Sequence, residues 1–313
     1  MSIKRRQVLT WGGLSGLGLA LTGKAFWGKE ASSIAQENVI SAATLETEGV
    51  VVANSTQPLL RFVSLADTGT GAQGQYAVAE AMTRYHQQNP FDLAILAGDN
   101  IYNDGEIEKI GAVFERPYEP LLRQGVKFHA CLGNHDIRTE NGDPQVRYSG
   151  FNMQNRRYYT LRRDDVQFFA LDTNGNADWQ NQLVWLDREL GQSDAIWKIV
   201  FAHDQIYSSA HYGVNQALIK KLSPMFKEHG VQLYINGHDH VYERTQPIEG
   251  TTYLICGAGA GTRPVGRSSW TAHSAERLSF AAYEVYRDRI EITAIATNHE
   301  PFDRGVISQQ AIG

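Results

Sequence analysis

The sequence predicts an α/β domain in which partly parallel, buried sheets carry helices on their outer faces. From residue 59 onward, apolar strand-like runs alternate with amphipathic helical stretches, a pattern typical of parallel strands connected through helices. The C-terminal part is rich in strand-like runs, which indicates a second sheet packed on the first. The 313 residues, 42% hydrophobic and 20% charged, are enough for a sizeable core and ordinary for a soluble globular protein.

Residues 1–30 have the layout of an export signal. Arg5 and Arg6 end a basic cluster that precedes a mildly apolar run over 8–23, which is too short and glycine-rich to span a bilayer comfortably. The arginine pair resembles a twin-arginine signal, and an ordinary export signal or an uncleaved anchor is the alternative. We therefore expect a bacterial protein exported to the periplasm or the medium, with no stable membrane span after signal removal.

Residues 31–57 lack strong periodicity and are predicted to be a linker, so the globular domain is expected over 58–313. Within it, the helix expected over 106–125 has a break at Pro117, and the run 158–173 is a predicted hairpin. In chain order, the other expected elements are strand 59–67, helix 75–89, strands 91–99 and 127–136, helix 177–192, strand 196–204, helix 216–230, and strand-like runs 231–240, 251–259 and 281–297.

Five of these apolar runs end in residues that can bind metal ions. The carboxyl ends of strands in an α/β sheet form the ligand crevice, so side chains far apart in the sequence are expected to meet there. One such end is weak evidence, because Asp or Asn beside Gly is usually turn chemistry and a lone His is usually a core residue. Together the five predict a metal site, and their side chains are Asp67, Asp99, Asn134, His203, His238 and His240.

The motifs at these ends, over residues 59–300, resemble the metallophosphoesterases, and specifically the small, single-domain purple acid phosphatases of the tartrate-resistant type. The wider superfamily carries a His two residues after the first Asp, and here that position is Gly69. The purple enzymes replace that His with the Tyr of a GDxxY motif, and Tyr102 is present. The motifs are Asp67-Thr68-Gly69, Gly98-Asp99-Asn100-Ile101-Tyr102, Gly133-Asn134-His135-Asp136, His203 and Gly237-His238-Asp239-His240.

The resemblance implies a four-layer α/β/β/α sandwich, with two mixed sheets and flanking helices, and a binuclear metal site. It assigns Asp67, Tyr102 and His240 to a first metal, Asn134, His203 and His238 to a second, and Asp99 to both. The donor chemistry agrees with this division. A phenolate and a carboxylate favour Fe(III), whereas two imidazoles and an amide oxygen suit divalent iron, zinc or manganese.

The implied function is that of a secreted phosphatase of the acid phosphatase type, which hydrolyses small phosphate monoesters with a metal-activated hydroxide. Asn134 and His135 are expected to contact the phosphate, and His135 to donate a proton to the leaving group. His211 lies about where the small members carry a second active-site His, with an exposed loop His as the alternative. The relatives usually have Glu where Ala210 stands and often a second His where Asp204 stands, which weakens any assignment of the proton donor.

Other functions remain open from the sequence. The same metal site serves phosphodiesterases or nucleotidases, and Arg263 or Arg267 is a candidate phosphate contact unless its loop is only a surface loop. A non-catalytic metal- or phosphate-binding protein is disfavoured because the ligand set is complete. A net charge of −5 without a basic block argues against a nucleic-acid partner.

The two cysteines, Cys131 and Cys256, lie in apolar runs. They are predicted to be buried thiols, and a disulfide between them stays open from the sequence. Two cysteines rule out an iron–sulfur cluster held by four of them. The sequence does not indicate an oligomeric state.

Overall fold

The computed structural model describes residues 57–309. The predicted export signal at 1–30, and the linker except for Gln57, lie outside the described residues. Within the described part, no helix combines the length and apolar character that a membrane crossing needs.

The first sheet has six strands in the order β13-β12-β11-β1-β2-β3. Its strands β1, β2 and β3 run parallel, and β11 pairs antiparallel with β1 to begin a C-terminal meander. The strands are β1 (Leu60–Leu65), β2 (Leu93–Leu96), β3 (Lys127–Ala130), β11 (Ser279–Val285), β12 (Arg289–Ala296) and β13 (Pro301–Ser308).

The second sheet has seven strands in the order β10-β8-β9-β7-β6-β5-β4. Strands β5, β6, β7 and β9 are parallel, whereas β4, β8 and β10 are antiparallel additions. The strands are β4 (Tyr159–Arg163), β5 (Val166–Ala170), β6 (Trp197–Phe201), β7 (Leu233–Asn236), β8 (Tyr242–Thr245), β9 (Thr252–Cys256) and β10 (Thr271–Ala275).

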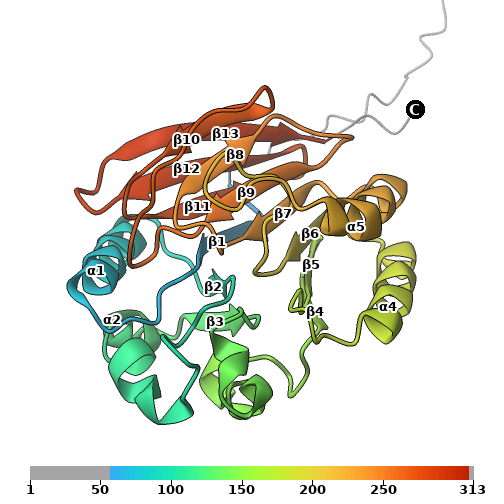
Figure 1. Cartoon of the computed structure of the whole chain (residues 1–313). Helices are drawn as coiled ribbons and strands as arrows, with labels where there is room; N and C mark the ends of the chain where they lie inside the picture. The colour runs from blue at the N-terminus through green and yellow to red at the C-terminus, as the bar shows by residue number, and fades with distance from the viewer. Residues whose placement is uncertain (1–56, 310–313) are drawn as a thin grey trace, which may run out of the picture. The chain divides into compact units, whose positions relative to one another are not determined.

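The two sheets share one apolar core, with helices outside both (Figure 1). Phe62 of β1 lies edge-on to Phe168 of β5 at 5.0 Å and stacks on Tyr283 of β11 at 4.2 Å, so aromatic rings connect the sheets. Helices α4 (Trp179–Gln192) and α5 (Gln216–His229) bury Leu186 and Leu218 in a second cluster with residues of the second sheet. The predicted α/β/β/α sandwich with two mixed sheets is confirmed.

Helix α1 (Gln73–Gln88) and the short α2 (Glu119–Arg123) accompany the first sheet. The predicted helix over 106–125 is instead three short pieces, which agrees with the expected break at Pro117 because proline has no N–H to continue a helix. The short elements are η1 (Ile107–Lys109), η2 (Gly111–Glu115), η3 (Asp136–Arg138), η4 (Glu140–Gly142), α3 (Asp143–Arg147) and η5 (Ser149–Phe151).

The parallel strands end a few residues before the motif residues, so the predicted strand 127–136 was too long: β3 stops at Ala130. The predicted hairpin is confirmed as β4 and β5, which turn at Asp164 with a left-handed backbone. Cys131 and Cys256 are both buried and free, which confirms the prediction of thiols.

Candidate metal centre

The loops that follow β1, β2, β3, β6 and β7 hold most of the predicted ligands, so both sheets contribute to one site. Asp67, Asp99 and His238 all have left-handed backbones, with φ of 57°, 52° and 72°. Such conformations are unfavourable for residues with a Cβ and cluster at functional sites, where the surrounding structure imposes them. Here neighbouring glycines allow close packing, because a Cβ on Gly237 would lie 2.4 Å from Asp67 Oδ2.

A first group of donor atoms surrounds the phenol oxygen of Tyr102. Its Oη lies 3.1 Å from Asp67 Oδ1, 2.9 Å from Asp99 Oδ2 and 3.2 Å from His240 Nε2. His240 Nε2 is in turn 3.4 Å from Asp67 Oδ1. Two carboxylates, a phenol and an imidazole therefore face a single point. The four residues come from positions between 67 and 240 of the sequence.

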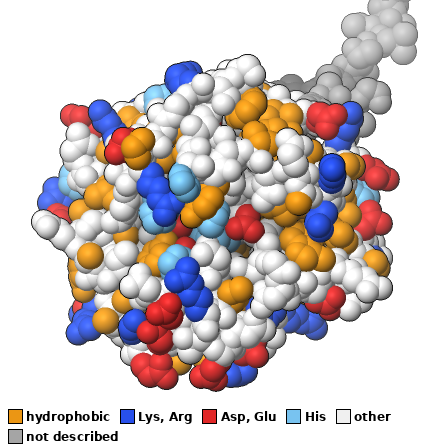
Figure 2. Space-filling view, viewed as in Figure 1, with side chains coloured by type: hydrophobic (Ala, Val, Ile, Leu, Met, Phe, Trp, Pro, Cys, Tyr) orange, Lys and Arg blue, Asp and Glu red, His pale blue; other side chains and the backbone are white. Residues whose placement is uncertain are grey.

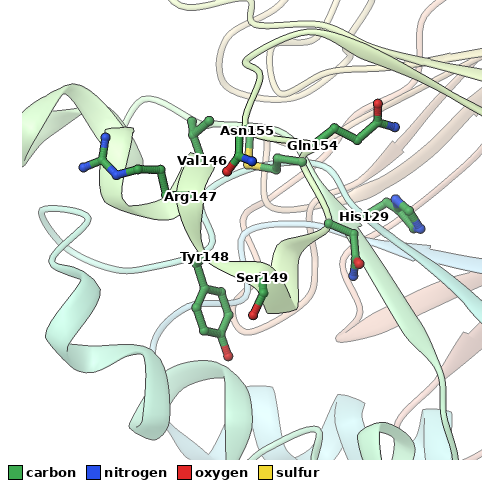
Figure 3. A pocket seen from close by; sticks show the side chains of 9 residues that line it. His129, Val146, Arg147, Tyr148, Ser149, Gln154 and Asn155 are labelled. Carbon is green, nitrogen blue, oxygen red and sulfur yellow. The ribbon is translucent and has the colours of Figure 1, made fainter.

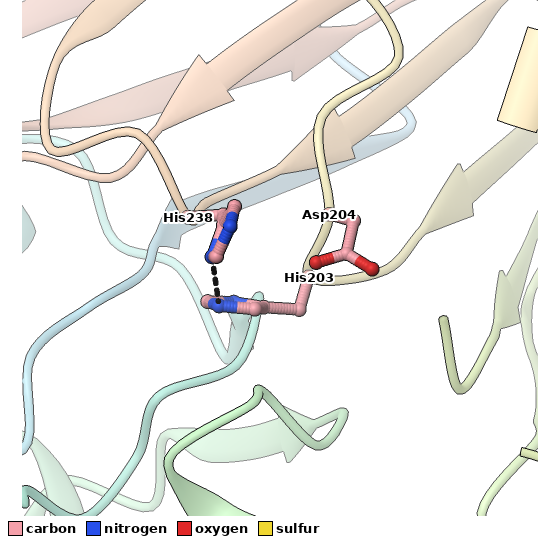
Figure 4. Close-up of side chains that lie close together, drawn as sticks. All are labelled: His203, Asp204 and His238. Atoms are coloured by element: carbon pink, nitrogen blue, oxygen red, sulfur yellow. Dashed lines mark hydrogen bonds between the residues drawn. The ribbon is translucent and has the colours of Figure 1, made fainter. Parts of the chain in front are cut away.

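A second group of donor atoms surrounds the ring of His203. Its Nε2 lies 3.1 Å from Asn134 Oδ1, 3.4 Å from Asp99 Oδ1 and 3.2 Å from His238 Nδ1 (Figure 4). His203 Nδ1 is 2.9 Å from the carbonyl oxygen of Ala97, and this hydrogen bond places the other ring nitrogen, Nε2, as the acceptor that faces the group.

Asp99 belongs to both groups because its two carboxylate oxygens point in different directions. Oδ2 accepts from Tyr102, whereas Oδ1 faces His203 and also accepts from the backbone N–H of His135 at 2.9 Å. Asp67, Asp99 and His203 can each place a donor atom within 4.8 Å of the others, and so can His203, Asp204 and His238. The seven residues predicted from the sequence thus converge.

The chemistry of this donor set fits bound cations. Burial, together with the charges of Asp67 and Asp99, raises the pKa of Tyr102 far above its usual value, so a phenolate here needs a nearby positive charge. Burial disfavours a charged His203, yet the carboxylate of Asp99 raises its pKa well above the usual value, so a metal ion at Nε2 would take the place of a proton there. Burial, and then the charge of His203, lowers the pKa of His238 to about 3, which leaves a neutral imidazole suited to metal binding.

The side chain of Asp136 connects the motif that contains Asp99 to the motif that contains Asn134. Its fully buried carboxylate accepts from the backbone N–H groups of Asn100, Ile101 and Gly133 at 2.8–3.1 Å. The side-chain amides of Asn100 and Gln145 donate to it as well. The carboxylate of Asp136 therefore orients the backbone of both motifs.

His135 lies at the rim of the first donor group. Its ring is 4.5 Å from the ring of Tyr102, and its Nε2 is 3.9 Å from Asp99 Oδ2. Nδ1 is 2.5 Å from the carbonyl oxygen of Asn103. Arg138 Nη2 lies 3.3 Å from His135 Nε2, because the short helix η3, which begins at Asp136 of the motif, turns Arg138 back toward His135. The sequence carried no signal for this contact.

His211 is exposed, and its ring contacts that of its neighbour Tyr212, with the two centroids 4.8 Å apart. Tyr212 itself stacks on His238 at 4.0 Å with an interplanar angle of 19°. The residue that covers the imidazole of His238 is therefore Tyr212. Asp239 is fully buried, and it accepts from Ser208 Oγ at 2.6 Å and from Tyr212 N at 3.3 Å, which anchors this loop.

Figure 2 shows His side chains gathered at the centre of one face, with Lys or Arg side chains beside them. A separate hollow of about 360 Å³ contains His129 of β3 and residues of the segment 146–155 (Figure 3), and it includes none of the predicted site residues. The chemistry is therefore concentrated at the strand ends, as expected for an α/β sheet.

Comparisons with known proteins agree with this geometry. The model of the calcineurin-like phosphoesterase family matches residues 60–242. Purple acid phosphatase 7 of Arabidopsis thaliana is 30% identical over 248 residues, which cover 68% of this chain and 72% of that protein. Tartrate-resistant acid phosphatase type 5 of Mus musculus is 28% identical over 239 residues, or 64% of this chain and 73% of that protein.

Two solved structures share the fold. The purple acid phosphatase PPD1 of yellow lupin superposes with a TM-score of 0.69 at 18% identity, over 80% of this chain and 54% of that one. GAP50, described as the anchor in the inner membrane complex of Plasmodium, also gives 0.69, at 19% identity over 80% of this chain and 89% of that one. The matched model spans more than half of the chain, so the protein belongs to the calcineurin-like phosphoesterases and, within them, resembles most clearly the purple acid phosphatases.

Proposed function

We propose that this chain is a binuclear metallophosphatase of the acid phosphatase type, which hydrolyses phosphate monoesters. The observation that carries the proposal is Asp99, whose two carboxylate oxygens each face a complete group of further donors. In this proposal Asp67, Tyr102 and His240 bind one metal ion, and Asn134, His203 and His238 bind the other. Two bound metal ions supply an activated water and a clamp for phosphate oxygens.

We propose Fe(III) for the Tyr102 group and a divalent iron, zinc or manganese ion for the His203 group. A phenolate and carboxylates are hard anionic donors, whereas the second group offers two imidazoles and an amide oxygen besides Asp99.

His135 is the proposed proton donor to the leaving alkoxide. Its Nε2 lies 3.9 Å from Asp99 Oδ2 at the rim of the site, which is a suitable position beside a phosphate held there. The carbonyl of Asn103 occupies Nδ1, so Nε2 is the nitrogen that meets substrate once Arg138, which lies 3.3 Å from it, turns toward the phosphate. His211, exposed on its loop, is the less well placed of the two predicted histidines, and its role is a substrate contact.

The amide of Asn134 has its Oδ1 directed at His203, so its NH₂ group is free to meet a phosphate oxygen. Arg138, next to His135, adds positive charge at the same rim. These groups position a phosphate dianion at the metal centre, in keeping with a small phosphate ester as substrate.

The exported location remains a proposal, since it depends on residues 1–30. A variant with both Arg5 and Arg6 changed to Lys is expected to accumulate inside the producing cell, whereas the unchanged chain is recovered from the periplasm or medium. Equal export of both chains in a fractionation experiment would contradict a twin-arginine signal.

The test of the proposed function is an assay of the purified, metal-analysed protein on phosphomonoesters and phosphodiesters across pH. We expect faster hydrolysis of monoesters, abolished by Asp99→Asn. Preference for diesters would assign the same site to a phosphodiesterase or nucleotidase. Metal binding without hydrolysis of either class would make the chain a non-catalytic member.

Tyr102→Phe tests the phenolate assignment by a readout other than activity. With iron in the first site, the wild-type protein is expected to show a purple charge-transfer band, and the variant to lose it. An unchanged band in the variant would remove Tyr102 from the ligand set.

A further inference from the structure

A second pocket, of about 550 Å³, adjoins the metal centre between the loop after β6 and the loop that joins β9 to β10. Its volume is that of an ordinary small-molecule site. The lining residues are Ser209, Ala210, His211, Arg263, Pro264, Val265 and Gly266. None of the seven proposed metal ligands lines it, so it is a separate feature of the active face.

Two backbone hydrogen bonds hold the loop that carries Arg263 in place beside the metal centre. The backbone N–H of Arg263 donates to the carbonyl of His240 at 2.9 Å, and that of Gly266 donates to the carbonyl of Ser209 at 3.0 Å. The first bond ties Arg263 to a proposed metal ligand, and the second ties the two loops together. Ser209 is itself held by the buried carboxylate of Glu243, which accepts from its N–H and from its hydroxyl, each at 2.6 Å.

Arg263 is also connected to the site through aromatic stacking. Its guanidinium carbon lies 5.4 Å from the ring centroid of Tyr212, and Tyr212 stacks on His238 at 4.0 Å. Tyr212 therefore has contacts with the guanidinium of the pocket as well as with an imidazole of the metal centre. A leaving group that extends from the metal centre past Tyr212 would therefore meet Arg263.

The guanidinium of Arg263 retains an unused donor. Its Nη1 is buried without a hydrogen-bond partner, and no carboxylate of the described residues lies within ion-pair distance of Arg263. Arg263 as a whole is half-buried and interacts with Tyr212, but a charged donor atom withdrawn from water without an acceptor is unfavourable, so Nη1 is available for a ligand. Arg267, in the same loop, differs because its Nη2 bonds the carbonyls of Thr271 and Ala272 at 3.3 and 3.1 Å.

We propose that this pocket receives the leaving group of the substrate and that Arg263 selects leaving groups carrying a second anion, phosphate or carboxylate. The guanidinium provides paired donors that match either anion, and Ala210, Pro264 and Val265 offer apolar contacts to the carbon skeleton between the two charges. This inference rests on the proposed function for the identity of the metal-bound end, and it goes beyond it by naming the class of leaving group.

The test is calorimetric binding of three non-hydrolysable phosphonates of similar length to the metal-analysed protein. Butylphosphonate has an uncharged tail, 3-phosphonopropionate a carboxylate tail, and ethane-1,2-diphosphonate a phosphonate tail. The two charged tails are expected to bind more tightly than butylphosphonate. The chemical nature of the preferred tail distinguishes a carboxylate from a phosphate source.

Arg263→Met is expected to reduce the preference for a charged tail by about 10- to 100-fold, as for loss of a charge-assisted hydrogen bond. Arg267→Met is the matched control and is expected to keep the preference. Equal losses for all three phosphonates in Arg263→Met would place Arg263 on the metal-bound phosphate and overturn the proposal. So would a preference that persists in this variant.

Binding and hydrolysis separate the two proposals. A protein that binds the charged tails through Arg263 but hydrolyses no ester would refute the proposed function and leave the inference standing. A protein that hydrolyses 4-nitrophenyl phosphate but binds all three phosphonates equally well would support the proposed function and refute the inference about Arg263.

Discussion

At the scale of single residues, the structure explains why a glycine at position 69 occurs together with a tyrosine at position 102. The carbonyl of Gly69 accepts from Tyr102 N at 2.8 Å, and a Cβ on Gly69 would lie 2.1 Å from the carbonyl oxygen of Asn100. The position cannot hold a histidine unless the backbone that carries Tyr102 moves. The pattern of Gly69 with Tyr102 was visible in the sequence, but the close backbone contact that explains it was not.

Gly69→Ala is therefore expected to destabilise the protein by about 3 kcal/mol, because the contact is with backbone and cannot be relieved by a rotamer change. Gly175→Ala is the control, since a Cβ there meets nothing within 4 Å. Urea unfolding of both variants measures the difference. Equal stability of the two would contradict the account of Gly69.

Asp136→Asn keeps the shape of the side chain but turns an NH₂ group toward N–H donors. We expect a loss of about 3 kcal/mol in unfolding free energy, because buried donors lose a charged acceptor. Asp143→Asn, at an exposed carboxylate paired with Arg157, serves as comparison and is expected to cost far less. A small effect at Asp136 would mean that the two motifs hold their positions without it.

At the scale of elements, the parallel strands were predictable and their surroundings were not. Runs such as 91–99 are apolar and end in a polar motif, so periodicity and turn chemistry gave both the strand and its functional end. The region 136–151 folds into short helical turns whose positions depend on tertiary contacts such as those of Asp136. Likewise, His211 was predicted to lie in the active site, but in the loop anchored by Asp239 it is Tyr212 that contacts His238.

Strand β3 contains a histidine, His129, whose pKa is changed by folding. Burial, and then the charge of Arg163, lowers the pKa of His129 to about 4. Between about pH 6.5 and pH 4 the unfolded chain binds a proton at His129 that the folded chain does not, so stability falls as the pH is lowered through this window. The contribution of this histidine amounts to at most about 3 kcal/mol, at 1.36 kcal/mol per pKa unit.

The measurement compares the pH dependence of unfolding free energy for the wild type and His129→Gln. The wild type is expected to lose more stability than the variant between pH 6.5 and pH 4, and the two curves are expected to run parallel above pH 7. Parallel curves across the whole range would show that His129 is not held in its neutral form.

At the scale of the whole molecule, the metal centre lies where the loops of two sheets meet. Asp67, Asp99 and Asn134 come from the first sheet, and His203 and His238 from the second. The alternation of strands and helices predicted the layers, and the strand ends predicted the ligands. The sequence marked Arg263 and Arg267 as candidate phosphate contacts but did not place their loop, because a loop's path depends on contacts such as the one between Arg263 and His240.

Removal of metal is expected to lower the melting temperature of the whole domain, because ions that bind only the folded state stabilise it by mass action. A chelator should therefore shift the transition of the wild type but have little effect on Asp99→Asn, whose site is already impaired. Scanning calorimetry with and without chelator measures both. A wild-type transition unaffected by chelator would indicate that bound metal ions do not contribute to the stability of the folded domain.

The central claim is that Asp99 joins two metal ions, and the metal content of the folded protein tests it most directly. Wild type and Asp99→Asn would be reconstituted with iron plus zinc or manganese, desalted and subjected to elemental analysis, with circular dichroism to verify folding. We predict two metal ions per wild-type chain and the loss of at least one in the variant. A folded wild-type chain without metal, or a variant that retains both ions, would contradict the claim.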